Sequence, residues 1–402
     1  MARVVHRPPS GRVGSTNVAA VADPDFQRAV LDAAPGPMHP AARETFLAAL
    51  DAGWADPRRL HSEGRRAAAL LDTARSVLAA GLDARPDEVT LHPTGSHALL
   101  AGLRGIRLAR RRVGATIVTT AVDQALVLRE PDVDAVGVDS EGRLDLVALR
   151  ERLAAPHVAL CVLAAANQEI GTRQPIADAL AASAAAGVPL LVDLAASWGR
   201  SPLPPRPDAY AADASSVGGP PLGVLAVRPG TRVKRQPVST PERGLEPAPP
   251  FVPLALAAAE AWRQQEADRE VEDRATSALI DRIRAAAAAL PDVQVVGSAT
   301  DRLPHVATFS VLYVDGETLV HELDRRGFAV ASGSACTADT LEPSHVLAAI
   351  GAVTHGNVRI TLPTSAVAPH RAQDVDRFCT VLPDAVSTDR KSTRLNSSHV
   401  SQ

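Results

Sequence analysis

The chain has 402 residues, of which 46% are hydrophobic and 22% are charged, and its formal net charge is −3 at pH 7. This composition is typical of an ordinary globular protein and excludes a chain that is disordered throughout. Because acidic and basic residues are interspersed, the sequence shows no charge footprint for nucleic acid or for an anionic membrane.

The sequence predicts a cytoplasmic protein. No apolar run approaches the roughly 18–20 residues that a membrane helix needs, and residues 1–21 lack the apolar core of a secretory signal. The three cysteines, Cys161, Cys336 and Cys379, are odd in number and far apart. We therefore expect free thiols in a reducing compartment rather than a disulfide framework.

The first two-thirds of the chain predict a large α/β domain. Residues 1–28 mix Arg, Pro, Ser and Gly without periodicity, and we expect a loose extension there. Residues 29–253 alternate apolar strands with amphipathic helices, which favours a mainly parallel sheet flanked by helices. The expected strands are 117–120, 135–138, 158–163, 189–194 and 222–227, and the expected helices include 146–154 and 176–186.

Residues 254–386 predict a smaller α+β domain, because the pattern changes after a proline-rich segment. The Ser/Thr/Asn-rich residues 387–402 differ from everything before them, and we expect a non-native or disordered tail. The elements expected in this domain are helices at 254–290, 317–326 and 374–382 and strands at 306–314, 328–331 and 358–362.

One thiol lies in a loop of small residues. Cys336 follows Gly333, Ser334 and Ala335, just ahead of a helix start expected in the segment 341–347. A thiolate nucleophile needs exposure and backbone freedom, which these small residues supply. The alternative is a buried core cysteine. Core packing is the interpretation that we favour for the other two cysteines, which lie in an apolar strand and an amphipathic helix.

Besides the Cys336 loop, four further segments follow one another in a characteristic order: residues 59–66, 167–172, 191–193 and 218–220. Together these segments resemble those of the cysteine desulfurases of the class V aminotransferase group, which are fold type I pyridoxal-phosphate (PLP) enzymes. The resemblance runs from about Leu31 to about Leu382.

This resemblance implies an α/β PLP-transferase fold with a seven-stranded type of sheet, a dimer, and L-cysteine as substrate. It implies that the Cys336 thiolate takes the substrate sulfur as a persulfide while alanine is released. Arg359 matches the residue that clamps the substrate carboxylate, a task that suits a guanidinium fork. The alternative for Arg359 is an ion pair at a domain surface.

Two cofactor contacts of the family are retained. Asp193 matches the aspartate that pairs with the pyridine nitrogen of PLP. The turn Thr94-Gly95-Ser96 matches the turn whose backbone N–H groups bind the cofactor phosphate. Its alternative is an ordinary helix N-cap.

The lysine that would form the imine with PLP is missing. Ser216 stands at its position, and the only lysines of the chain are Lys234 and Lys391. A serine hydroxyl cannot form an imine, and its pKa is far from the working range of an acid–base catalyst. Asp213 replaces the serine that meets the phosphate, and its carboxylate would repel a phosphate dianion unless it is protonated or paired.

Other cofactor contacts also differ from the family. Gln124 replaces a histidine that stacks on the ring, Gln168 an asparagine near the ring hydroxyl, and Ala196 a glutamine. The segment that reaches the neighbouring subunit's phosphate becomes residues 246–249. We therefore expect no covalent PLP and leave non-covalent PLP open. We expect no metal, nucleic acid or membrane partner.

Three functions are compatible with this sequence. The protein accepts sulfur from L-cysteine or a persulfide donor on Cys336 and passes it to an acceptor protein; or it is an active PLP-dependent desulfurase with an unusual site; or it is a non-catalytic subunit. As a subunit it would form a homodimer or a heterodimer with a complete paralogue.

Overall fold

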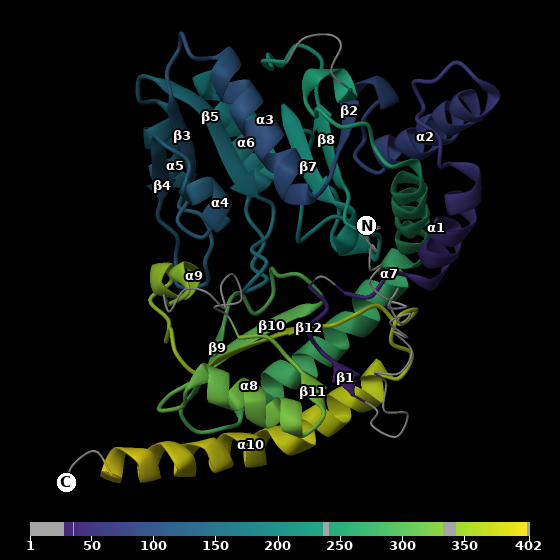
Figure 1. Cartoon of the computed structure of the whole chain (residues 1–402). Helices are drawn as coiled ribbons and strands as arrows, with labels where there is room; N and C mark the ends of the chain where they lie inside the picture. The colour runs from purple at the N-terminus through teal and green to yellow at the C-terminus, as the bar shows by residue number, and fades with distance from the viewer. Residues whose placement is uncertain (1–27, 35, 236–240, 333–342, 400–402) are drawn as a thin grey trace, which may run out of the picture.

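The computed structural model describes residues 28–34, 36–235, 241–332 and 343–399, with the side chains of residues 389–399 left out. Its centre is a seven-stranded sheet in the order β2-β8-β7-β6-β5-β3-β4 (Figure 1). Strand β8 is antiparallel to both neighbours and the other pairs are parallel. The strands are β2 Val89–His92, β3 Thr116–Thr120, β4 Val133–Val136, β5 Val158–Ala164, β6 Leu190–Asp193, β7 Ala209–Asp213 and β8 Gly223–Val227.

Helices cover the sheet and confirm the predicted α/β fold. Strands β5 and β6 are apolar and buried along nearly their whole length, as expected of strands covered on both faces. Helix α6 ends at Gly187, whose φ of 64° is the left-handed conformation that favours glycine at a helix end. The flanking helices are α3 Gly95–Ala109, α4 Ala125–Leu128, α5 Leu146–Leu153 and α6 Ile176–Ala186.

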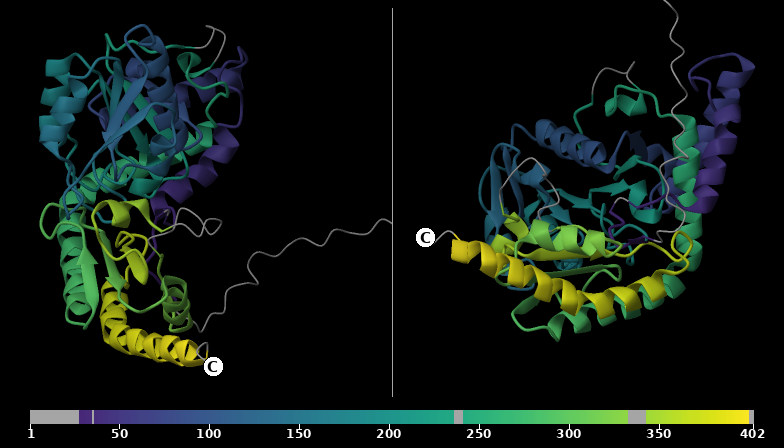
Figure 2. Two further views of the ribbon diagram at one scale, coloured as in Figure 1. Left: turned by 90° about the vertical axis from the view of Figure 1, so that its left-hand side faces the viewer. Right: turned by 60° about the horizontal axis from the view of Figure 1, so that its bottom comes forward.

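Helix α7 joins the large unit to the small one. It spans 37 residues, Val252–Ala288, and its first half packs against α1 and α2. Its second half packs against a three-stranded antiparallel sheet in the order β12-β10-β9, and α10 lies alongside it (Figure 2). The elements are α1 Pro40–Ala52, α2 Ser62–Ala80, β9 Val293–Val296, β10 Val306–Val311, α8 Gly316–Arg325, α9 His345–Ala349, β12 Asn357–Thr361 and α10 Arg371–His399.

The small unit has a hydrophobic core of its own. Phe328 meets Phe378 edge to face, with ring centroids 5.6 Å apart. Strand β1, Ala29–Val30, pairs with β11, Phe328–Ala329, so the start of the described chain packs in this unit rather than in the large one. The expected N-terminal extension lies in residues outside the described part, apart from residue 28.

The structure differs from the sequence predictions in several strands. The expected set lacks β1, β2, β7 and β9, and β4 begins two residues before the expected range. β7 is rich in alanine, a residue of low strand propensity, and only its buried position between β6 and β8 makes it a strand. Helix α10 ends at His399, within residues 387–402, for which the prediction of a non-native or disordered tail stays a prediction.

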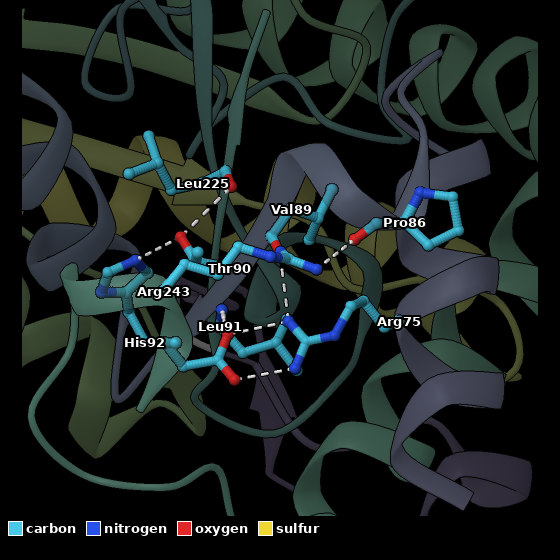
Figure 3. Close-up of polar contacts among 9 residues, drawn as sticks. Arg75, Pro86, Val89, Thr90, Leu91, His92, Leu225 and Arg243 are labelled. Carbon is cyan, nitrogen blue, oxygen red and sulfur yellow. Dashed lines mark hydrogen bonds and ion pairs between the residues drawn. The ribbon is translucent and has the colours of Figure 1, made fainter. Parts of the chain in front are cut away.

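A buried ion pair fastens the edge strand β2 to the segment before α7 (Figure 3). The two carboxylate oxygens of Glu242 each accept a hydrogen bond of 2.7 Å from Arg75, and one of them also accepts one of 2.6 Å from the Leu91 N–H. Arg75 donates further to the Val89 carbonyl at 3.0 Å. Both side chains are at most 10% exposed, so each charge depends on the other.

Replacing Arg75 with alanine leaves the buried Glu242 carboxylate without its counter-ion. We expect the Arg75→Ala variant to lose about 3–5 kcal/mol of unfolding free energy in a urea titration. Arg274→Ala is the control, because that arginine and its partner Glu270 are exposed on α7. Equal losses in both variants would contradict the assigned role.

Candidate functional site

The candidate site lies at the edge of the sheet where the parallel strands end. Asp193 is the last residue of β6 and Asp213 the last residue of β7. Gly95 begins α3 just after the N-cap Thr94. The carboxyl ends of parallel strands and the start of a helix form a crevice of the kind in which α/β proteins bind ligands.

Asp193 is buried and hydrogen-bonded. Its carboxylate accepts the Ala195 N–H at 2.9 Å and a hydrogen bond from the side-chain amide of Gln124. Burial raises the pKa of Asp193 to about 7, and these two hydrogen bonds oppose that rise only in part. The structure therefore brings two of the predicted site residues together, with Gln124 as the side-chain partner of Asp193.

Asp213 occupies the start of α3. One of its carboxylate oxygens accepts the Gly95 N–H at 2.8 Å, and the other accepts the Ser215 N–H at 2.9 Å. The contact is close, because a Cβ added to Gly95 would lie 2.5 Å from the Cβ of Asp213 and 2.6 Å from its Oδ2. A carboxylate at this position is favoured by the helix dipole. The carboxylate is thus paired with the backbone donors to which an anionic ligand would bind.

Ser216 directs its hydroxyl at the backbone of its own turn. It lies in the 3₁₀ turn Ala214–Val217, and its Oγ donates to the Asp213 carbonyl at 2.7 Å. The same Oγ is 3.2 Å from the Trp198 carbonyl, and Arg200 donates to the Ser216 carbonyl at 3.0 Å. These contacts fix the turn and leave no side-chain amine at this position.

Lys234 does not replace the missing lysine. Its side chain is exposed, and its backbone N–H donates to the Gly105 carbonyl at 2.8 Å. Gly105 lies ten residues along α3 from Gly95, which is about 15 Å at 1.5 Å per residue. The side chain of Lys391 lies outside the described ones. No lysine side chain of the described part therefore lies beside Asp193.

The opposite wall of the crevice is fixed by two polar residues that sequence analysis did not select. Asn167 donates to the Val122 carbonyl at 2.7 Å and accepts the Glu169 and Ile170 N–H groups. Asp123 accepts the Ala164 N–H at 3.0 Å, and its own carbonyl oxygen is 2.9 Å from Nε2 of His345 in α9. These bonds position the loop that carries Gln124.

Arg359 lies in β12, in the interior, and faces two carboxyl groups. Its Nη2 is 3.6 Å from Oδ1 of Asp32, and its buried Nε has no hydrogen-bond partner among the residues that the structure describes. Glu169 is also buried, which raises its pKa to about 7, while Ser344 and the Arg359 charge oppose this rise. The structure thus gives Arg359 an interior ion pair with one guanidinium nitrogen free of partners. Glu169 was missed as a site residue, since only its burial distinguishes it.

The remaining predicted residues differ in their exposure, and Cys336 is not among the described ones. Cys336 and its loop lie outside the described residues. Ser96 and Gln168 are exposed. Cys161 is fully buried in β5 and Cys379 is half-buried against the core of the small unit, so both are core residues as predicted. Burial raises the pKa of the Cys161 thiol to about 12, and it raises that of Cys379 as well.

The residues present do not fit covalently bound PLP. An imine needs an amine, and Ser216 has a hydroxyl. The phosphate needs the N–H donors at the start of α3, and the Asp213 carboxylate takes the Gly95 N–H. The pyridine nitrogen needs the Asp193 carboxylate, and the Gln124 amide bonds to it. Each of these three positions is satisfied by the chain's own groups.

Among the described residues, no group of three or more His, Cys, Asp or Glu side chains is arranged to hold a metal ion. No helix within this part combines the length and the apolar character that crossing a membrane requires.

Comparisons with known proteins agree on one family. The model of the Aminotransferase class-V family matches residues 31–241 and 242–378. An "IscS-like cysteine desulfurase" of Mycobacterium tuberculosis is 33% identical over 386 residues, covering 89% of this chain and 96% of the relative. A "Cysteine desulfurase" of Cereibacter sphaeroides is 32% identical over 372 residues, covering 86% and 92%.

Solved structures agree on the fold. A structure titled "NIFS-LIKE PROTEIN" superposes with a TM-score of 0.80 at 22% identity, over 90% of this chain and 100% of the other. The apo structure of a cysteine desulfurase from Thermococcus onnurineus NA1 has a TM-score of 0.75 at 19% identity, over 90% and 95%.

The raised pKa of Asp193 predicts a pH-dependent stability. The folded protein holds this proton up to about pH 7, whereas the unfolded chain releases it near pH 4. The contribution of Asp193 to the unfolding free energy therefore falls as the pH rises from about 4 to 7. In the Asp193→Asn variant this decline is absent. The unfolding free energy of the variant, measured relative to that of wild type, should therefore rise by up to about 4 kcal/mol between pH 4 and pH 8.

Urea unfolding at a series of pH values measures this difference. The control is Asp51→Asn, which changes an exposed carboxyl group of α1. If the difference between Asp193→Asn and wild type does not change with pH, Asp193 is not held protonated by burial.

Proposed function

Because this chain belongs to the class-V aminotransferase family, and within it to the cysteine desulfurases, we propose that it carries sulfur as a persulfide on Cys336 without binding PLP covalently. The observation that supports this most strongly is the Asp213 carboxylate on the Gly95 N–H, beside a serine in place of the lysine. The family is PLP-dependent, and in this chain Ser216 takes the place of the lysine and Asp213 that of the serine that meets the phosphate.

The missing lysine removes an amine, and no lysine side chain of the described residues takes its place. General acid–base catalysis supplies about 10²–10⁴-fold in rate, and it needs a group whose pKa lies near the working pH. The Ser216 hydroxyl has no such pKa and is bonded to a backbone carbonyl. Lys234, exposed near the far end of α3, does not compensate. Release of alanine from cysteine is therefore not the reaction that this site supports.

Sulfur transfer to a thiol needs none of these groups. The Cys336 thiolate attacks the outer sulfur of a persulfide donor, and the new S–S bond forms as the donor's S–S bond breaks. The donor leaves as its thiolate, and no external oxidant or reductant is consumed. Burial raises the thiol pKa values of Cys161 and Cys379, which keeps both protonated and unreactive. The burial of these two thiols leaves Cys336 as the cysteine that we propose as the acceptor.

We also propose a protein partner, because cysteine desulfurases are typically dimers. Leu47, Leu50 and Trp54 form an exposed apolar row along α1 and just after it, with exposed fractions of 46%, 39% and 63%. Apolar surface of this kind favours an interface. The row suits either a second copy of this chain or a complete paralogue, and purification from the native cell distinguishes these partners.

Mass spectrometry tests the persulfide directly. After exposure of the purified protein to a persulfide donor, we expect one added sulfur on the Cys336 peptide and none on the Cys161 or Cys379 peptides. Cys336→Ser is the control and should gain nothing. Unmodified Cys336, or alanine and sulfide released from cysteine with added PLP, would contradict the proposal.

A pair of variants tests whether Asp213 and Ser216 together exclude the cofactor. Ser216→Lys restores only the amine, while Asp213→Ser in the same chain also frees the Gly95 N–H. We expect the double variant to retain at least about tenfold more PLP than Ser216→Lys after borohydride reduction, since it lacks the repulsion between carboxylate and phosphate. Equal retention by the two variants would show that Asp213 is no barrier.

A further inference from the structure

Two adjoining hollows lie at the other edge of the sheet, where the parallel strands begin. The larger has a volume of about 370 Å³, and it lies between the end of α3, the turn before β6 and the turn after β8. The smaller, of about 280 Å³, lies beside the turn that follows α3. They share Arg110 and Arg232. This edge faces away from the β12-β10-β9 sheet and from the candidate site (Figure 1).

The hollows are lined by arginines with almost no acidic counterpart. Within the described chain, no ion pair is formed by Arg111, Arg112, Arg228 or Arg232. By contrast, two arginines on α3 form ion pairs with Glu130 and Asp132. Asp208 supplies the one carboxylate in the lining, and it accepts the Leu190 N–H at 2.9 Å and lies 3.4 Å from the Thr231 hydroxyl. Its hydrogen bonds are thus made within the chain.

Arg110 is already held in place between the two hollows. Its Nη2 donates to the Gly187 carbonyl at 3.1 Å, while its Nε is buried and has no hydrogen-bond partner in the structure. A buried donor without an acceptor is costly and points to a group that the structure does not contain. The backbone around it is open, because no atom lies within 4 Å of a Cβ added at Gly187 or at Gly230.

The larger hollow also has an apolar wall, opposite in character to the arginines. In pockets for small molecules, an apolar wall contacts the apolar part of the ligand and a few polar groups orient it. Such pockets usually measure about 300–1,000 Å³. Guanidinium groups match phosphate oxygens in a two-pronged geometry. The apolar residues are Ile106, Leu180, Ala184, Val188 and Pro189.

We propose that this hollow binds a small organic phosphate of the size of a nucleoside di- or triphosphate. The phosphate chain contacts Arg110, Arg228 and Arg232, and the planar or apolar body rests on the wall formed by α3, α6 and the start of β6. The site is independent of Cys336 and of the crevice at Asp193, so it stands or falls separately from the proposed persulfide function.

Isothermal titration of the full chain with ATP, tripolyphosphate and adenosine tests the site. We expect ATP to bind more tightly than tripolyphosphate and adenosine not to bind, because both the phosphates and the body contribute. Arg228→Ala and Arg232→Ala should each weaken ATP binding about tenfold, the effect of losing one charged hydrogen bond. Arg129→Ala is the matched control, an exposed arginine outside both hollows, and should bind ATP as wild type does.

Three results would overturn the proposal. The first is that ATP gives no binding heat. The second is that the Arg228 and Arg232 variants bind ATP as tightly as the control. The third is that tripolyphosphate binds as tightly as ATP, which would show that the hollow binds polyanions in general. Thermal melts of each variant verify that the fold is intact. Arg228 and Arg232 are both exposed, and if one variant is unstable the other decides the outcome.

Discussion

The hydrogen bond from the Gly95 N–H to the Asp213 carboxylate determines what the crevice can hold. The first N–H groups of a helix lack partners within the helix and need an acceptor. Here the end of β7 supplies a charged one, so α3 is satisfied without any ligand. In the function that we propose, this carboxylate takes the place of the cofactor phosphate, and Ser216 and Gln124 replace two further cofactor contacts of the family.

The rest of the fold is held together by contacts outside those positions. The buried Arg75–Glu242 pair holds the edge strand β2 to the segment before α7. Helix α7 then packs against α1 and α2 in one unit and against β9 and β10 in the other. Asn167 and Asp123 position the loops of the crevice through backbone contacts. A family fold can therefore keep its shape while its cofactor contacts are replaced.

Strand β6 was predicted from sequence because an apolar run between turn residues is typical of a buried parallel strand. β7 was not, since its alanines fit a strand only once β6 and β8 lie on either side. The resemblance marked Asp193, Gln124 and Asp213 as site residues, but the hydrogen bonds that join Gln124 to Asp193 and Gly95 to Asp213 span 69 and 118 residues. Such pairings depend on tertiary structure and leave no local signal.

The most direct test of this account is a crystal structure of the protein grown with PLP in excess. We predict that the Asp213 carboxylate remains on the Gly95 N–H, the Gln124 amide remains on Asp193, and no cofactor lies between them. A phosphate group bound at the start of α3, with the Asp213 side chain displaced from Gly95, would contradict the account.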